Sequence, residues 1–440
     1  MQQRHSADAH DHRSATNADR RRRSPIAIAL RLTIALLLTG CTATVDGHAL
    51  KAATDADSDG AVIALMNTGI YQVTAWPPFG VAGADRGLQN DLEAQRLAVN
   101  VVGPWQADAK LTFRPALENT LVTAPQEDAT WLSSDGLFSP ELAAIAANHG
   151  YQTGFSTMRV SDPALPQRGL VNAVLMFPDA PSAAAAAAEL ASRAPIGGGP
   201  ARTLNPDNHP EALARAIDHP DGSMTAVSFD AHGRYVLYQW AHTALSRPER
   251  TADLLVTSTL AAQATVVDRF VPTDPNKLAD LPKDPSGALL AKTLATPDNR
   301  VPLIVGVWQP TAWLHFEDNP LTATALFTQT GVDAVAQRTT TVYQATNAEA
   351  ASRLADGIAA QIAAEPGVES TPGVPGLPAA RCFTRPGERS STESTMSVAR
   401  IFWHYKCVGR ADRYAYTAVS GREDDVKQQM AAQYRILAGQ

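Results

Sequence analysis

One order of secondary structure occurs twice in the sequence, and this recurrence constrains the fold more than any other feature. Residues 171–177 form an apolar run typical of a strand, and the alanine-rich residues 181–193 form a helix that Asp179 can cap. Two strand patterns, 224–229 and 235–240, and a helical pattern at 250–267 come next. The same order returns later in the chain, at residues 339–344, 347–363, 399–408, 414–419 and 422–437.

The repeated order predicts an α+β fold with two related halves, each with helices on one face of a mainly antiparallel sheet. Arg234 and Tyr235 enter one late strand as Arg413 and Tyr414 enter the other. We therefore expect residues 160–270 and 325–440 to be similar units. Chance similarity between common elements is the alternative.

Proline content indicates where the two halves separate. Residues 272–300 contain five prolines, a composition typical of a linker. The sequence thus predicts a signal peptide (1–40), a polar tether (41–60), an amino-terminal α+β domain (61–271), a linker (272–300) and a carboxy-terminal α+β domain (301–440).

The amino terminus has the plan of a lipoprotein signal peptide. Four consecutive arginines begin at Arg20, the apolar stretch 32–38 follows Arg31, and small residues precede Cys41. The segment Leu38-Thr39-Gly40-Cys41 resembles the bacterial lipobox, in which a lipid is attached to the cysteine thiol. This predicts attachment to the extracytoplasmic face of the cell membrane through Cys41. A transmembrane anchor, or a cleaved signal with an incidental cysteine, is the alternative, but the apolar stretch is too short to span a bilayer.

Two cysteines remain after Cys41, namely Cys382 and Cys407. In an exported chain they are expected to form a disulfide. A metal-binding or catalytic thiol is the alternative, but no second Cys or His pair at ligand spacing lies nearby, and His404 alone is insufficient. No metal site and no cofactor are predicted.

Charge and motifs limit the classes of function. After residue 40 the chain has 30 basic and 41 acidic residues, which argues against a nucleic-acid partner. None of the strong catalytic motifs is present, so no catalytic residue is assigned.

Trp308 and Trp313 belong to an aromatic segment that is a possible partner-binding surface, with a buried strand as the alternative. Glu93 and Arg96 are expected to form a solvated pair on a helix, with a buried charge pair that has a role in a site as the alternative.

Several short patterns resemble an uncharacterised lipoprotein family of mycobacteria and related actinobacteria, which has an amino-terminal and a carboxy-terminal domain. The resemblance implies lipoprotein status, an envelope location and paired cysteines, and it brings no established activity. It rests on Thr68, Gly69, Tyr71, Leu92, Glu93, Ala94, Arg96, Val101, Val102, Pro104, Arg381, Cys382, Cys407, Arg413, Tyr414, Gln433, Tyr434 and Leu437.

These observations predict a lipid-anchored envelope protein that is not an enzyme and that binds a partner or has a structural role. The partner is expected to be another envelope protein, a polymer or a lipid. The alternatives are an extracytoplasmic hydrolase with a dispersed catalytic site and a lipid carrier with an apolar cavity.

Overall fold

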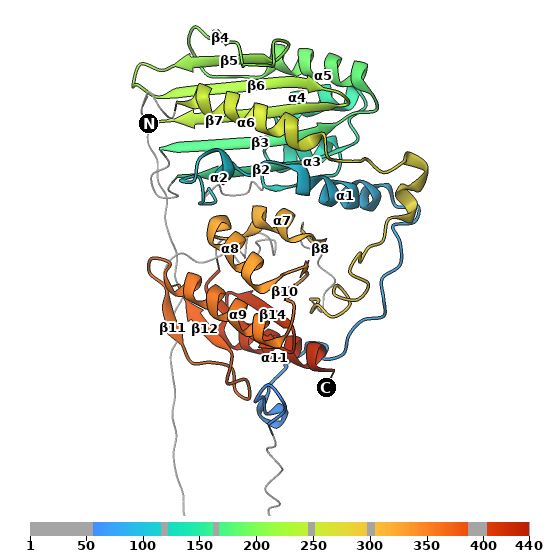
Figure 1. Ribbon diagram of the computed structural model, residues 1–440, viewed down its shortest axis with the longest axis vertical. Coiled ribbons are helices and arrows are strands. Elements are labelled where there is room, and N and C mark those ends of the chain that lie inside the picture. Colours follow the sequence, from blue (N-terminus) through green and yellow to red (C-terminus); the bar gives the residue numbers. More distant parts are fainter. Residues whose placement is uncertain are drawn as a thin grey trace, which may run out of the picture. The chain divides into compact units, whose positions relative to one another are not determined.

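The computed structural model describes residues 56–115, 122–161, 167–244, 251–296, 304–385 and 403–439 (Figure 1). The predicted signal peptide and Cys41 lie outside these residues. Within the described residues no helix has both the length and the apolar character needed to cross a membrane.

The first half contains a sheet in which every neighbouring pair of strands is antiparallel. The strand order across the sheet is β1-β2-β3-β7-β6-β5-β4. The strands are β1 (Ala124–Gln126), β2 (Thr153–Val160), β3 (Arg168–Met176), β4 (Arg202–Leu204), β5 (Leu213–Asp218), β6 (Met224–His232) and β7 (Tyr235–Thr243).

The second half contains a sheet of the same design. Read from the other edge, its order is β8-β9-β10-β14-β13-β12-β11, which repeats the order of the first sheet strand for strand. The strands are β8 (Gly306–Trp308), β9 (Ala334–Gln337), β10 (Thr341–Gln344), β11 (Glu369–Thr371), β12 (Arg381–Thr384), β13 (Tyr405–Ala411) and β14 (Tyr414–Ser420).

The pairing register is also repeated. Tyr235 of β7 pairs with Met176 of β3, and Tyr414 of β14 pairs with Gln344 of β10. Each of these tyrosines begins its strand after a two-residue turn and pairs with the last residue of the preceding strand. Because a one-residue slip would turn every side chain to the opposite face, the shared register makes equivalent residues of the two halves identifiable. The predicted α+β fold in two related halves is confirmed.

The helices also correspond between the halves, with equivalent caps. Asp179 accepts a hydrogen bond from the Ser182 N–H at the start of α5, and Asn347 accepts one from the Ala350 N–H at the start of α9. The helices are α1 (Arg86–Leu97), α2 (Pro104–Ala107), α3 (Ala129–Ser134), α4 (Pro140–Asn148), α5 (Ala180–Arg193), α6 (Ala252–Val267), α7 (Pro310–Trp313), α8 (Pro320–Thr330), α9 (Ala348–Ala363) and α11 (Glu423–Ala438).

Helices cover both faces of each sheet, so the expectation of helices on one face is wrong. In the first half, Phe229 packs with Leu190 of α5 on one face, while Leu237 belongs to the core with Leu260 of α6 on the other. The first seven residues of β6 are all buried, so neither face of this strand is left to solvent. A strand buried on both faces requires cover on both. In the second half α9 and α11 take these two roles.

A buried glutamine of the last helix fastens an earlier segment in each half. The Gln263 side chain accepts a hydrogen bond from the Val102 N–H and donates one to the Asn100 carbonyl, both at 2.8 Å. The Gln433 side chain accepts a hydrogen bond from the Leu294 N–H at 2.8 Å and donates one to the Lys292 carbonyl at 2.7 Å. In both halves the acceptor carbonyl lies two residues before the donor N–H. These matched bonds identify Gln263 of α6 and Gln433 of α11 as equivalent positions.

The segments outside the two sheets are fixed by specific contacts. In the predicted tether and the start of the predicted amino-terminal domain, the Val62 N–H donates to the Gly376 carbonyl and Asp59 forms an ion pair with Arg410. The proline-rich segment is held as well, since the Lys283 N–H donates to a carbonyl at residue 80. Residues 57–79 therefore pack on the second half, and the proline-rich segment is not a free spacer.

Candidate functional site

The aromatic segment that was a possible partner surface lies in the core. Trp308 is 1% exposed and Trp313 is fully buried, and both share one hydrophobic core with Phe155 of β2. Trp308 and Phe155 have ring centroids 6.4 Å apart. Arg159 of β2 donates to the carbonyls of this segment, including that of His315 at 2.6 Å. Burial removes the sequence support for a surface built from the two indole rings.

Trp308 nevertheless forms part of the wall of a pocket of about 370 Å³, which we call the α1 pocket. This volume lies in the range of small-molecule sites. Its lining comes from α1, from the proline-rich segment, from the strands β8 and β9, and from the residues that directly follow β8 and precede β9. The lining residues are Leu92, Gln95, Arg96, Leu281, Pro282, Pro285, Ser286, Val307, Trp308, Gln309, Asp333 and Ala334.

The α1 pocket combines apolar walls with charges of both signs. Arg96 is paired with Glu93 and Asp333 with Arg413, but their side chains are 42% and 57% exposed, so a ligand can still reach both. Gln95 donates to the Val305 carbonyl at 3.1 Å, which holds the strand β8 segment against α1. The arrangement suits a ligand with an apolar body and polar ends.

Glu93 holds the first edge of the proline-rich segment and is not part of a solvated pair, so that expectation is wrong. Its carboxylate is 1% exposed and accepts from both the N–H and the hydroxyl of Thr273, each at 2.7 Å. Arg96 forms an ion pair with the same carboxylate at 2.6 Å. A buried carboxylate needs such partners, and here they fix the segment that lines the α1 pocket.

The second half also contains a buried charged cluster that the sequence reading missed. Glu317 accepts from Trp313 Nε1 at 2.6 Å and from the Tyr343 hydroxyl at 2.8 Å, while Lys406 forms an ion pair with Asp318 at 2.6 Å. The cavity beside them is about 20 Å³, room for about one water molecule. The available signal was Lys406, a charged residue between Tyr405 and the cysteine expected to be buried in a disulfide.

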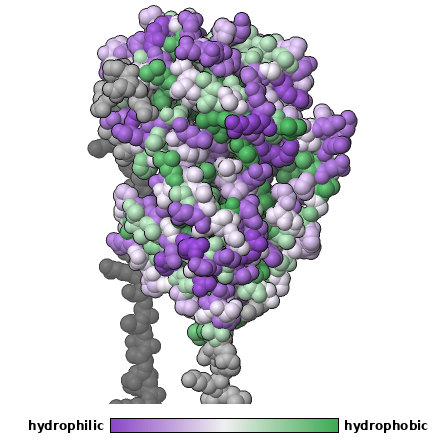
Figure 2. Space-filling model, viewed as in Figure 1, coloured by the Kyte–Doolittle hydropathy of each residue, from purple (hydrophilic) through white to green (hydrophobic). Residues whose placement is uncertain are grey.

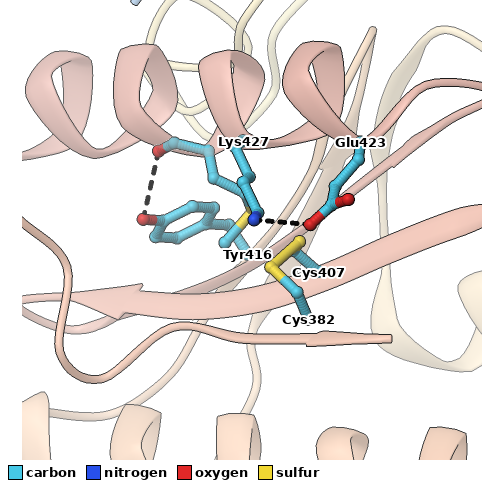
Figure 3. Close-up of a disulfide and its surroundings, with 6 residues drawn as sticks. Cys382, Cys407, Tyr416, Glu423 and Lys427 are labelled. Atoms are coloured by element: carbon cyan, nitrogen blue, oxygen red, sulfur yellow. Dashed lines mark hydrogen bonds and ion pairs between the residues drawn. A yellow bond between two sulfur atoms is a disulfide. The ribbon is translucent and has the colours of Figure 1, made fainter. Parts of the chain in front are cut away.

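The expected disulfide between Cys382 and Cys407 is present (Figure 3). The two residues are direct register partners on β12 and β13, and both are buried between the sheet and α11. The equivalent pair in the first half is Ala214 and Ser228 on β5 and β6. The disulfide therefore strengthens one sheet at a position where the other sheet has none.

The described residues also bear on metal and catalytic chemistry. They contain no cluster of histidine, cysteine, aspartate or glutamate able to hold a metal ion. Six histidine rings of the described part hydrogen-bond to carboxylates, as in the pair His209 and Asp230, or to threonine hydroxyls, as in His315 and Thr157. On the face shown in Figure 2, hydrophobic residues are scattered among hydrophilic ones.

Comparison with known proteins assigns a family. Residues 82–283 match the amino-terminal domain of unknown function DUF7373, and residues 289–440 match its carboxy-terminal domain. The chain belongs to this uncharacterised two-domain family, as the sequence patterns indicated. Lipoprotein status and an actinobacterial origin remain predictions.

Two further comparisons add little about function. No curated protein matches the chain. Among solved structures, the extracellular domain of PknH from Mycobacterium tuberculosis is similar, with 12% sequence identity and a TM-score of 0.29 over 40% of this chain and 97% of that chain.

Proposed function

We propose that this chain is an extracytoplasmic, lipid-anchored binding protein of the cell envelope, and that its ligand occupies the α1 pocket. The pocket is the observation that carries the binding role. It has the volume of a ligand site, apolar walls and accessible charges of both signs. The ligand class that fits is an amphipathic small molecule or a short amphipathic part of an envelope polymer or lipid.

The anchor is supported by the sequence at the amino terminus. Arginines, a short apolar stretch and a lipobox-like segment precede Cys41. Expression of the parent and a Cys41→Ser variant with an alkyne-tagged fatty acid tests this. Label and membrane retention are expected for the parent alone, and equal labelling of both would overturn the anchor.

The α1 pocket is tested with a fluorescent apolar anion, anilinonaphthalene sulfonate, whose charge matches Arg96. Gln309 is exposed and lines the pocket, so Gln309→Trp places a bulky ring at the lining without disturbing the core. We expect saturable binding to the parent and an affinity about tenfold lower for this variant. Gln72→Trp, at an exposed position outside the lining, is the matched control. Equal affinity in the parent and Gln309→Trp would contradict the assignment.

A further inference from the structure

The loop between β4 and β5 in the first half has the conformation of the loop between β11 and β12 in the second. His209 and Ala212 each donate a main-chain hydrogen bond, at 3.1 Å, to the carbonyl three residues earlier. Leu377 and Ala380 make the same two bonds at 3.0 Å. The residues before His209 and Leu377 are Asn208 and Gly376, and both have positive φ, 65° and 80°. The two loops therefore present equivalent carbonyl groups.

In the second half, the space beside this loop is filled by the chain's own residues 57–71. The Val62 N–H donates to the Gly376 carbonyl at 2.8 Å, and Ala61 packs in the same core cluster as Leu377. Further along, the Tyr71 hydroxyl donates to Asp425 of α11 at 2.8 Å. The segment thus runs from the loop to the first half of α11.

Gly69 lies so close to the Gln428 side chain on α11 that a Cβ atom there would clash unless that side chain moved. Asp425 and Gln428 are two of the α11 positions that touch this segment. Counted back from the matched glutamines Gln263 and Gln433, they correspond to Leu255 and Ser258 of α6. The comparison therefore locates the same space in the first half.

Among the residues that the structure describes, none fills that space in the first half. A depression of about 660 Å³, which we call the open groove, lies between the β4–β5 loop and α6. Leu255 and Ser258 both line it, as does Asn208. The Asn208 carbonyl is equivalent to the Gly376 carbonyl, which accepts the hydrogen bond from the Val62 N–H. Leu254 also lines the groove and is 45% exposed, an uncovered apolar side chain in a helix.

We propose that the open groove binds an extended segment of another protein, in the way that the second half binds residues 57–71. The segment would donate a main-chain N–H to the Asn208 carbonyl and place apolar side chains on Leu254 and Leu255. The lining includes Asp207 and Asp253, of which Asp253 is already paired with Arg202 at 2.7 Å, and none of the described residues that line the groove is a lysine or arginine. A segment that carries basic side chains therefore fits the groove best, whereas residues 57–71 carry two aspartates.

Synthetic peptides test this proposal. The probe is a fluorescent peptide of residues 57–71 in which Asp57→Lys and Asp59→Lys are introduced, and its anisotropy is followed on titration with the full chain carrying Cys41→Ser. We expect saturable binding, with about tenfold weaker binding of the unmodified acidic peptide. Ser258→Trp, which fills the groove from α6, should abolish binding, and Asp207→Lys should weaken binding of the basic peptide.

Thr265→Trp is the matched control, because Thr265 is exposed on the same helix and does not line the groove. Unchanged binding in the Ser258→Trp variant would overturn the proposal, as would the lack of any saturable binding by the basic peptide up to about 1 mM. Light scattering of the parent and Ser258→Trp tests the other occupant. A dimer of the parent that Ser258→Trp dissociates would show that the groove takes a second copy, and this would also overturn the assignment to another protein.

Discussion

The two halves of the molecule share a framework and differ in what they bury. On the face covered by α5 in the first half lie Leu137, Phe138 and Val227. Aligning the helix caps Ser139 and Asn319 makes Glu317 and Asp318 equivalent to Leu137 and Phe138. The strand register makes Lys406 equivalent to Val227, and the three charged residues form the cluster of the second half. The comparison teaches that strand order, caps and the fastening glutamines define this fold, while the side chains between sheet and helix can change from apolar to charged.

The largest expected effect tests whether the two fastening glutamines are equivalent. Gln263→Leu and Gln433→Leu should each lower the free energy of unfolding by about 4 kcal/mol, because each leaves a buried N–H and a partly buried carbonyl without this partner. Urea unfolding measures both. The exposed Gln167→Leu is the control and should cost little. A loss below about 1 kcal/mol for either buried glutamine would break the equivalence.

The second prediction concerns a variant in which the disulfide of the second half is replaced by the residues found at the equivalent positions of the first half. Cys382→Ala with Cys407→Ser copies the pair Ala214 and Ser228, and it should lower the free energy of unfolding by about 3.5 kcal/mol through the entropy of the open loop. Addition of a reducing agent should destabilise the parent by a similar amount and leave the double variant unchanged. If the double variant is as stable as the parent, the disulfide does not stabilise the native sheet.

The third prediction concerns a position that is titratable and buried in both halves. Asp135 is 4% exposed, and burial raises its pKa to about 7. The unfolded carboxyl ionises near pH 4 while the folded one stays protonated, so this group lowers stability as pH rises from about 4 to about 7. Relative to the parent, Asp135→Asn should gain about 2 kcal/mol between pH 5 and pH 7. Unfolding curves whose difference does not change with pH would contradict this.

The equivalent position in the second half should show the opposite sign. Burial lowers the pKa of His315 to about 3, so the folded ring stays neutral. The unfolded ring takes up a proton below about pH 6.5, and this group therefore lowers stability as pH falls through that range. His315→Gln should lessen the loss of stability on acidification, which the same unfolding series would measure.

The smallest expected effect concerns the two arginines at the hairpin turns. Arg234 Nε donates to the Phe177 carbonyl at 2.8 Å, and Arg413 Nε donates to the Ala345 carbonyl at 2.9 Å, each just after the strand that pairs with the hairpin. Arg→Lys at either position removes the planar guanidinium with its several N–H donors. Each substitution should lower the free energy of unfolding, measured by thermal unfolding, by about 1 kcal/mol. Clearly unequal costs would show that the two turns are not equivalent.

Much of the framework was readable from the sequence because it depends on local signals. The caps Asp179 and Asn347, the repeated strand and helix patterns and the paired arginines all act over a few residues. The disulfide followed from the count of cysteines in a chain expected to be exported.

The rest depends on contacts between distant parts of the chain. The apolar run of a strand buried on both faces, such as β3, has no alternating pattern from which the covered face could be read. Trp308 is buried because Phe155, far away in sequence, packs against it, and Glu93 is buried because Thr273 meets it. The open groove is visible only when the two loops and the two helices are compared in space.

The shared register is the central claim, and a transplanted disulfide tests it most directly. Ala214→Cys with Ser228→Cys places two thiols at the positions that Cys382 and Cys407 occupy in the second sheet. If the halves are equivalent, non-reducing peptide mapping of the oxidised, folded protein will show the two introduced thiols joined to each other beside an intact Cys382–Cys407 bond. Free introduced thiols in folded protein that retains the Cys382–Cys407 bond would contradict the account.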